Sequence, residues 1–163
     1  MKKKVLHEII SYILIILFVV LVRSFIVTPV KVKGPSMMPT LKEKDVLILN
    51  KLKKNYKRGD IVVIKKLGKT DEIIKRIIGI PGDTVEIEKG VVYINTKKLD
   101  EPYKKGMTGN LDLIKLKENE YFVLGDNRGV SMDSRLIGPI TKKEIKGKTK
   151  IRLFPLKRIG KVQ

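Results

Sequence analysis

Residues 72–83 read Glu-Ile-Ile-Lys-Arg-Ile-Ile-Gly-Ile-Pro-Gly-Asp, an apolar run that contains two basic residues and ends in a turn signal. Isoleucine-rich runs of this length, bounded by Gly and Pro, are typical of β-strands. Residues 60–65, Asp-Ile-Val-Val-Ile-Lys, have the same character and follow the turn residues Arg58-Gly59. The two segments predict strands, and hence a β-sheet.

Similar β-branched runs lie on both sides of this pair. They predict further strands at residues 45–50, 84–88, 91–95 and 121–124. Lys89-Gly90 between two of these runs predicts a tight hairpin. Thr141 and Glu144 have the spacing of a capping box, which predicts a short helix at 141–145. Residues 97–117 have the weakest pattern, so we expect a surface excursion there, and the domain as a whole is predicted to be mainly β.

The N-terminus has a different pattern. Residues 1–4 are basic, and residues 9–22 are apolar apart from Ser11 and Tyr12. Extended to residue 27, this segment reaches the roughly 20 residues that a bilayer requires. No small-x-small cleavage site follows it, so we expect an uncleaved transmembrane signal-anchor at 9–27 rather than a cleavable signal or a buried core helix. The basic start predicts a short cytoplasmic N-terminus, 1–8, and an extracytoplasmic domain, 28–163.

The composition narrows the choice of partners. The chain has 36 Lys and Arg against 17 Asp and Glu, a formal net charge of +19, which favours an anionic surface as a partner. Lysine predominates and tryptophan is absent, whereas nucleic-acid readers use arginine forks and stacked aromatic rings. We therefore expect membrane lipid as a partner and no nucleic acid. With no cysteine and one histidine, we expect no disulfide, no metal and no other cofactor.

Ser36 is the candidate nucleophile. It lies in Gly-Pro-Ser-Met-Met-Pro-Thr-Leu, residues 34–41, where proline and glycine constrain the backbone. The chain has no thiol, and its one histidine, His7, precedes the hydrophobic segment. A serine hydrolase built on this chain would therefore use a lysine as its base. The alternative is that Ser36 only caps a turn.

Lys75 is the candidate base. Alternation along a strand places it on one face with Ile73 and Ile77. Burial between apolar neighbours lowers the pKa of a lysine, because it disfavours the ammonium form. A lysine with such a pKa can accept a proton near neutral pH. The alternative is that Lys75 points to solvent, as most of the lysines should.

Residues 125–135 are the third notable segment, Gly-Asp-Asn-Arg-Gly-Val-Ser-Met-Asp-Ser-Arg. Acids, arginines, an amide and hydroxyls at this density favour a hydrogen-bonded network. We expect Asp133 to pair with Arg135, and Ser131 to exchange a hydrogen bond with a neutral lysine amine. The alternative is a solvated turn rich in Gly, Asn and Asp.

Taken together, these segments resemble the bacterial type I signal peptidases, or leader peptidases, of the peptidase S26 family, in the short form typical of Gram-positive bacteria. The anchor, the serine box, Arg58-Gly59-Asp60-Ile61-Val62, the lysine box and Gly-Asp-Asn-Arg occur in the family's order over nearly the whole chain. The resemblance implies one N-terminal transmembrane helix followed by a single all-β catalytic domain of the signal peptidase/LexA-like type. It also implies a single-pass protein of the bacterial plasma membrane.

The resemblance assigns roles by motif. It implies that Ser36 is the nucleophile, Lys75 the general base, and Ser131 the hydroxyl that orients the lysine amine. The residues expected to support the site are Asp126, Asn127, Arg128, Asp133 and Arg135. The residues expected to form shallow substrate pockets are Val32, Met37, Leu41, Ile73 and Ile74. Gly34 replaces a hydroxyl residue of Gram-negative members, so the oxyanion hole is expected to use the Ser36 N–H with help from the Gly34 region.

The implied function is removal of N-terminal signal peptides from secreted pre-proteins, after small residues in an Ala-x-Ala pattern, through an acyl-enzyme. Two other interpretations stay open. One is a self-cleaving Ser/Lys repressor-type protease, which the anchor and the lack of a DNA-binding domain disfavour. The other is a membrane-tethered basic binding module without catalysis.

Overall fold

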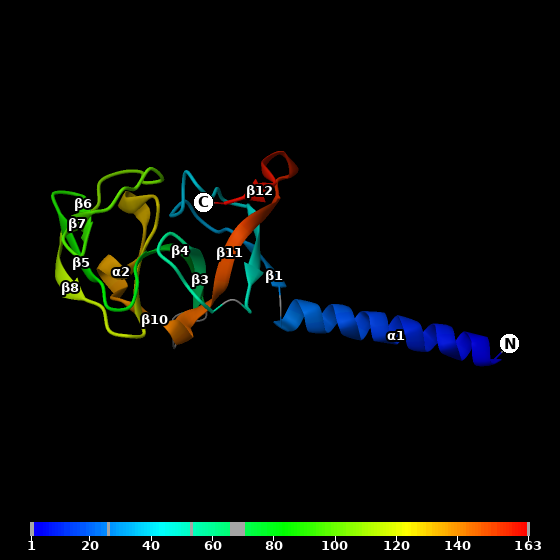
Figure 1. Cartoon of the computed structure of the whole chain (residues 1–163). Coiled ribbons are helices and arrows are strands. Elements are labelled where there is room, and N and C mark those ends of the chain that lie inside the picture. Colours follow the sequence, from blue (N-terminus) through cyan, green and yellow to red (C-terminus); the bar gives the residue numbers. More distant parts are fainter. Residues whose placement is uncertain (1, 26, 53, 66–70, 163) are drawn as a thin grey trace.

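The computed structural model describes residues 2–25, 27–52, 54–65 and 71–162. Its first element is α1 (Lys2–Phe25), which projects away from the β-rich part of the chain (Figure 1). Residues 1 and 26, which belong to the predicted N-terminal segment and anchor, lie outside the described residues. Across the described residues, no helix has both the length and the hydropathy needed to span a membrane.

The larger of the two antiparallel sheets in the described part of the chain contains the segments 61–65 and 72–79. Its strands lie in the order β1 (Val27–Lys31), β2 (Val46–Asn50), β11 (Ile145–Phe154), β3 (Ile61–Lys65), β4 (Glu72–Gly79), β9 (Glu120–Leu124) and β10 (Ile140–Thr141), with β12 (Gly160–Lys161) paired to β11. The predicted strands at 60–65 and 72–78 are confirmed, and they pair antiparallel with Val62 opposite Lys75.

The smaller sheet contains β7 (Lys97–Lys98), β6 (Val91–Ile94), β5 (Thr84–Glu88) and β8 (Leu111–Lys115), in that order. The hairpin predicted at Lys89-Gly90 joins β5 to β6, with Glu88 opposite Val91. Both turn residues have positive φ, 48° and 79°, which a two-residue hairpin of this kind requires. In Figure 1 this sheet lies on the side of the domain away from α1.

The other four predicted strands are confirmed as β2, β5, β6 and β9. The helix predicted at 141–145 is only a 3-10 turn, η2 (Lys142–Glu144), although its capping box forms as predicted. It is this short because β11 begins at Ile145. Residues 97–117 are more regular than expected, since they contain β7 and β8. The remaining helical elements are η1 (Arg128–Val130), α2 (Ser134–Ile137) and η3 (Leu156–Arg158).

Strand β4 lies where three buried apolar clusters meet. Ile77 and Ile73 pack in a cluster with Val62 and Val123, which confirms that these two isoleucines share a face. Ile78 belongs to a second cluster, under the smaller sheet. Ile74 packs against a third cluster, formed with the loop between β1 and β2. The strand is buried from Lys75 to Gly79, which makes this part of it a rigid support for a functional group.

Candidate active site

The structure brings Ser36 and Lys75 together. Ser36 lies in the loop between β1 and β2, Lys75 lies on β4, and Lys75 Nζ donates a hydrogen bond to Ser36 Oγ at 2.8 Å. Lys75 is only 3% exposed. Burial lowers its pKa from 10.5 to about 8, although the nearby carboxylates of Asp133 and Asp126 act in the opposite direction. An amine with this pKa is partly neutral near neutral pH and can accept the proton of the hydroxyl it touches.

A cleft of about 610 Å³ opens over this pair. Its lining consists of Val30, Lys31, Lys33, Ser36, Asp71, Glu72, Ile73, Ile74 and Lys75. The end of β1 with the residues after it, and the start of β4, both supply lining residues, so an extended peptide could lie between two backbone segments. Two of the predicted substrate-pocket residues, Ile73 and Ile74, are among those that line it.

The other three predicted pocket residues are core residues. Val32, Met37 and Leu41 are at most 3% exposed and pack in the cluster that also contains Leu47 and Ile61. None of the three lines the cleft. These three residues contact the cleft indirectly, because Ile74 packs against their cluster and also lines the cleft. Direct contact of these three with a substrate stays a prediction.

The Ser36 loop is fixed by the segment that follows β9. The backbone N–H of Asn127 donates to the Ser36 carbonyl at 3.0 Å, and Asn127 Nδ2 donates to the Pro35 carbonyl at 3.3 Å. Thr40 Oγ1 donates to Asp126 at 2.5 Å. The predicted supporting residues Asp126 and Asn127 therefore contact the loop that carries the serine.

The C-terminal part of the chain ties the same loop from another side. Arg152 Nη1 and Arg158 Nη2 donate to the Thr40 carbonyl, at 3.2 and 3.5 Å. Both arginines also form ion pairs with the buried Asp45, at 3.3 and 3.1 Å. The backbone around Ser36 is thus held by residues that lie far away in the sequence.

Arg76 is the residue of this network that the sequence reasoning missed. Its Nε and Nη2 donate to the two carboxylate oxygens of Asp126 at 2.8 and 2.7 Å, and both side chains are buried. Its Nη1 donates to the Gly59 carbonyl at 3.1 Å. Arg76 directly follows Lys75 in an apolar strand, so strand alternation, applied to the arginine as well, indicates a second buried cation on the opposite face.

The remaining predicted supporting residues form two ion pairs, each with one fully buried partner. Arg128 donates to the Gly125 carbonyl at 3.0 Å and to Thr108 Oγ1 at 2.7 Å, and it pairs with Glu101. The expected pair between Asp133 and Arg135 is confirmed, at 2.8 Å. Asp133 also accepts from the Gly125 N–H at 3.0 Å, so the two pairs meet at the backbone of one glycine.

Ser131 differs from its expected arrangement. Its hydroxyl is buried and has no hydrogen-bond partner among the described residues, so the expected bond to the lysine amine is not formed here. The hydroxyl packs against Gly125, where an added Cβ would lie 2.2 Å from Ser131 Oγ and 2.6 Å from the Ser36 carbonyl oxygen. Gly125 is therefore the second site residue missed from the sequence, and its lack of a side chain lets Ser131 and the Ser36 loop approach each other. The orienting role of Ser131 stays a prediction.

Gly34, the expected departure at the oxyanion hole, has a φ of +75°. This left-handed backbone conformation is strained for residues with a Cβ, although no atom lies within 4 Å of the place a Cβ would occupy. Glycine at this position therefore allows the left-handed backbone conformation two residues before Ser36. A serine or threonine here would meet strain rather than a steric clash.

Comparison with known proteins identifies the family of this chain. Residues 5–154 match the family described as signal peptidase, peptidase S26. A signal peptidase I of Bacillus amyloliquefaciens is 40% identical over 168 residues, which cover 94% of this chain and 90% of the relative. A signal peptidase IB of Staphylococcus aureus (strain COL) is 40% identical over 178 residues, which cover 95% of this chain and 92% of the relative.

A solved structure gives the same result. The crystal structure of a signal peptidase I from Enterococcus faecalis V583 superposes with a TM-score of 0.52 at 31% identity, and the match covers 58% of this chain and 96% of that one. The fold and the sequence together define a serine peptidase. The chain belongs to the signal peptidase family, peptidase S26.

Proposed function

We propose that the chain is a membrane-bound endopeptidase that removes signal peptides with a Ser36/Lys75 dyad. The observation that carries the proposal is the 2.8 Å contact between the buried Lys75 amine and Ser36 Oγ, in residues that line a cleft. Neutral Lys75 takes the hydroxyl proton as Ser36 Oγ bonds to the peptide carbonyl carbon. The C–N bond then breaks, and the lysine ammonium gives its proton to the leaving amine. In the second half, Lys75 takes a proton from water as the water oxygen bonds to the acyl carbon, the bond from that carbon to Ser36 Oγ breaks, and the lysine ammonium returns the proton to Ser36 Oγ.

The surrounding residues take supporting roles in this mechanism. Asp126, Asn127, Arg128, Asp133 and Arg135 hold the backbone on which the serine is presented, and Ser131 packs against Gly125 beside it. The Ser36 N–H, helped by the Gly34 region, holds the oxyanion. The pre-protein lies as an extended strand in the cleft, where Ile73 and Ile74 favour small side chains of the Ala-x-Ala type.

Helix α1 serves as the membrane anchor in this proposal. Its apolar side chains from Val5 to Val20 are exposed in the structure, which supports lipid as their partner. The lysines at its start favour a cytoplasmic N-terminus and a domain on the extracytoplasmic face of a bacterial plasma membrane. Retention of the full chain in the membrane pellet after alkaline carbonate extraction is the expected result, and its release into the supernatant would remove this part of the proposal.

The decisive experiment is cleavage of a purified pre-protein with an Ala-x-Ala signal, in detergent or lipid. Wild type should cut at that site, whereas Ser36→Ala and Lys75→Ala should lose at least a thousandfold in kcat/KM. Lys117→Ala, which changes a lysine that is 81% exposed, is the matched control and should cut like wild type. Equal cleavage by Ser36→Ala would disprove the dyad. Salt-sensitive vesicle binding without cleavage by any variant would favour the tethered binding module.

A further inference from the structure

The segment after β7, which has little pattern in the sequence, packs directly against the network around the dyad. The Lys105 N–H donates to the Asp126 carbonyl at 2.8 Å, and the Arg128 N–H donates to the Lys105 carbonyl at 2.9 Å. Lys105 thereby forms a short parallel bridge with Asn127. Glu101 and Thr108, in the same part of the chain, both bind the Arg128 side chain. This segment is attached at several points to residues that fix the Ser36 loop.

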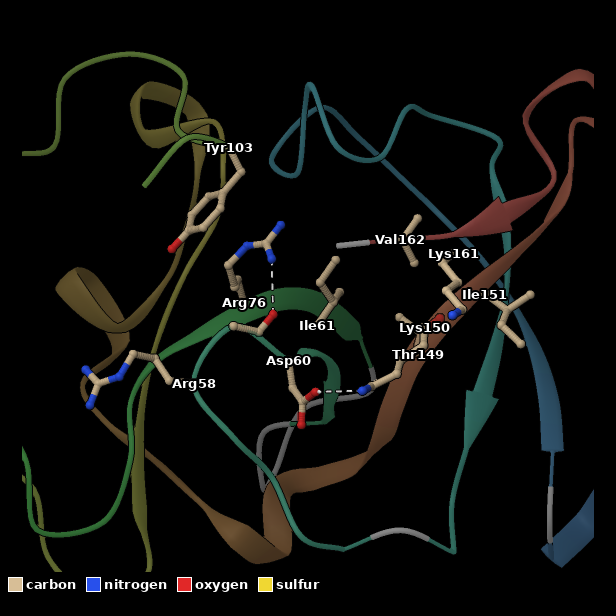
Figure 2. A pocket seen from close by; sticks show the side chains of 11 residues that line it. Arg58, Asp60, Ile61, Arg76, Tyr103, Thr149, Lys150, Ile151, Lys161 and Val162 are labelled. Carbon is tan, nitrogen blue, oxygen red and sulfur yellow. Dashed lines mark hydrogen bonds and ion pairs between the residues drawn. The ribbon is translucent and has the colours of Figure 1, made fainter. Parts of the chain in front are cut away.

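Tyr103, from the same segment, covers Arg76. The guanidinium carbon of Arg76 lies 3.9 Å from the centre of the Tyr103 ring, in the range of a cation–π contact. In Figure 2 the ring lies close to the Arg76 guanidinium, while a dashed line joins Arg76 to the backbone carbonyl on its other side. The tyrosine therefore limits the positions that the guanidinium can take.

The contact with Tyr103 matters because an open space lies beside Arg76. Arg76 and Tyr103 both line a cavity of about 660 Å³ that shares no residue with the catalytic cleft. Asp60 lines the same cavity, and its carboxylate pairs with Lys148 at 2.8 Å. A guanidinium released from the ring would have room to move and a second carboxylate nearby. The bidentate contact with Asp126 is then no longer its only favourable position.

We infer that Tyr103 is a positioning residue for the reaction, which acts by holding Arg76 on Asp126 so that the Ser36 loop keeps its shape. The path is short: Tyr103 stacks on Arg76, Arg76 binds Asp126, and Asp126 accepts from Thr40 in the Ser36 loop. The inference rests on the proposed Ser36/Lys75 dyad. It assigns a role to a residue in the segment that joins β7 to β8, which contains none of the motifs quoted from the sequence.

The same path predicts an electrostatic effect on the dyad. Two carboxylates face Lys75: Asp133, which is paired with Arg135, and Asp126, which is paired with Arg76. The negative charge of Asp126 raises the pKa of Lys75. If Arg76 moves away from Asp126, less of this charge is compensated, and the pKa of Lys75 should rise.

Around Tyr103 itself, the charged groups are Glu101, Arg76, Arg128 and Asp126. Burial raises the pKa of the Tyr103 phenol well above its ordinary value, and Glu101 acts in the same direction. The phenol therefore stays neutral through the pH range of an activity assay. If the low-pH side of the pH profile of kcat/KM shifts in a Tyr103 variant, the shift therefore reports the pKa of Lys75 and not that of the tyrosine.

The test compares Tyr103→Leu with Tyr103→Phe in the full chain, with the pre-protein cleavage assay. Leucine keeps apolar packing but has no ring face, so kcat should fall on the order of tenfold while KM stays within about twofold. The acid limb of the pH profile of kcat/KM should move to higher pH. Phenylalanine keeps the ring face and should retain activity to within about twofold. Tyr93→Leu, a half-buried tyrosine of β6, is the matched control and should behave like wild type.

The outcomes separate the inference from the proposed function. Wild-type kcat and acid limb in Tyr103→Leu would overturn the inference, and so would an equal loss of kcat in Tyr103→Phe. Tyr103→Leu could also lose kcat only in proportion to its thermal unfolding, with an unshifted pH profile. Tyr103 would then have a purely structural role, and the inference would again be overturned. Cleavage by Ser36→Ala, measured in the same series, would instead remove the dyad itself.

Discussion

The two faces of strand β4 hold two buried cations in opposite ways. Lys75 and Arg76 are neighbours in the sequence, and they are 3% and 2% exposed. The lysine amine contacts a neutral hydroxyl, while the guanidinium is bound to both oxygens of a buried carboxylate and stacked against a ring. On one face the positive charge is poorly compensated, and on the other it is fully paired.

This difference shows that burial alone does not decide what a basic residue does. Arginine remains charged in proteins, so it suits the face where a permanent ion pair holds two segments together. Lysine changes its pKa readily when buried, so it suits the face where a proton must be exchanged. The strand therefore places a structural cation next to the amine that we propose as the base, and the alternation of side chains puts the two on opposite faces.

The largest effect should come from Lys75→Met. Loss of the base should reduce kcat/KM for pre-protein cleavage by about 10³–10⁴-fold. The same change should raise the free energy of unfolding at pH 7 by on the order of 2 kcal/mol, because methionine fills the space without a charge to desolvate. Cleavage kinetics and urea unfolding on the same samples measure both changes. A Lys75→Met protein that is less stable than wild type would show that the amine is well compensated after all.

Arg76→Met should have the opposite effect on stability. It leaves Asp126 buried without its partner, which costs about 3–5 kcal/mol in comparable buried pairs. Urea unfolding followed by circular dichroism would measure this loss. Lys117→Met, at an exposed pair 3.9 Å from Glu120, is the control and should change stability by less than about 0.5 kcal/mol. Equal small losses in both variants would contradict the distinction between the two faces.

The effect of a single pH unit is the smallest, and it applies to the lysine face alone. The base acts when neutral, so kcat/KM should fall about tenfold per pH unit below a pKa of about 8. For stability, the folded-state pKa lies below the ordinary value of 10.5, so the free energy of unfolding should rise as the pH increases from about 8 towards 10.5. A cleavage rate that stays constant from pH 8 to pH 5 would rule out a lysine base.

Much of this arrangement can be predicted from the sequence, wherever the local residue pattern favours the same structure that the residues adopt in the fold. The strands at 60–65 and 72–78, the hairpin at 89–90 and the placement of Lys75 between two isoleucines all follow from period-2 alternation and turn chemistry. The pairing of Asp133 with Arg135 was also predictable, because the two residues are close in sequence.

The parts that escaped prediction depend on contacts between distant segments. Strand β11 holds three lysines among its first six residues. The burial of Lys148 is compensated by its ion pair with Asp60 and by its hydrogen bond to the Asn55 carbonyl, both at 2.8 Å. Gly147 allows the backbone of β2 to approach, since an added Cβ would lie 2.4 Å from the Asn50 carbonyl oxygen. The roles of Arg76 and Tyr103 likewise need the fold, because Arg76 is 27 positions from Tyr103 and 50 positions from Asp126 in the chain.

The ties of the Ser36 loop also bear on the order in which the protein matures. The bond from Thr40 to Asp126 spans 86 positions, and the bond from Arg152 to the Thr40 carbonyl spans 112. Contacts of such long range form late in folding, because large loops must close first. A nascent chain that has not yet received its last strands therefore has the serine but lacks the shape that would make it reactive. Activity would then begin only after the C-terminal part of the chain has been synthesised and has folded.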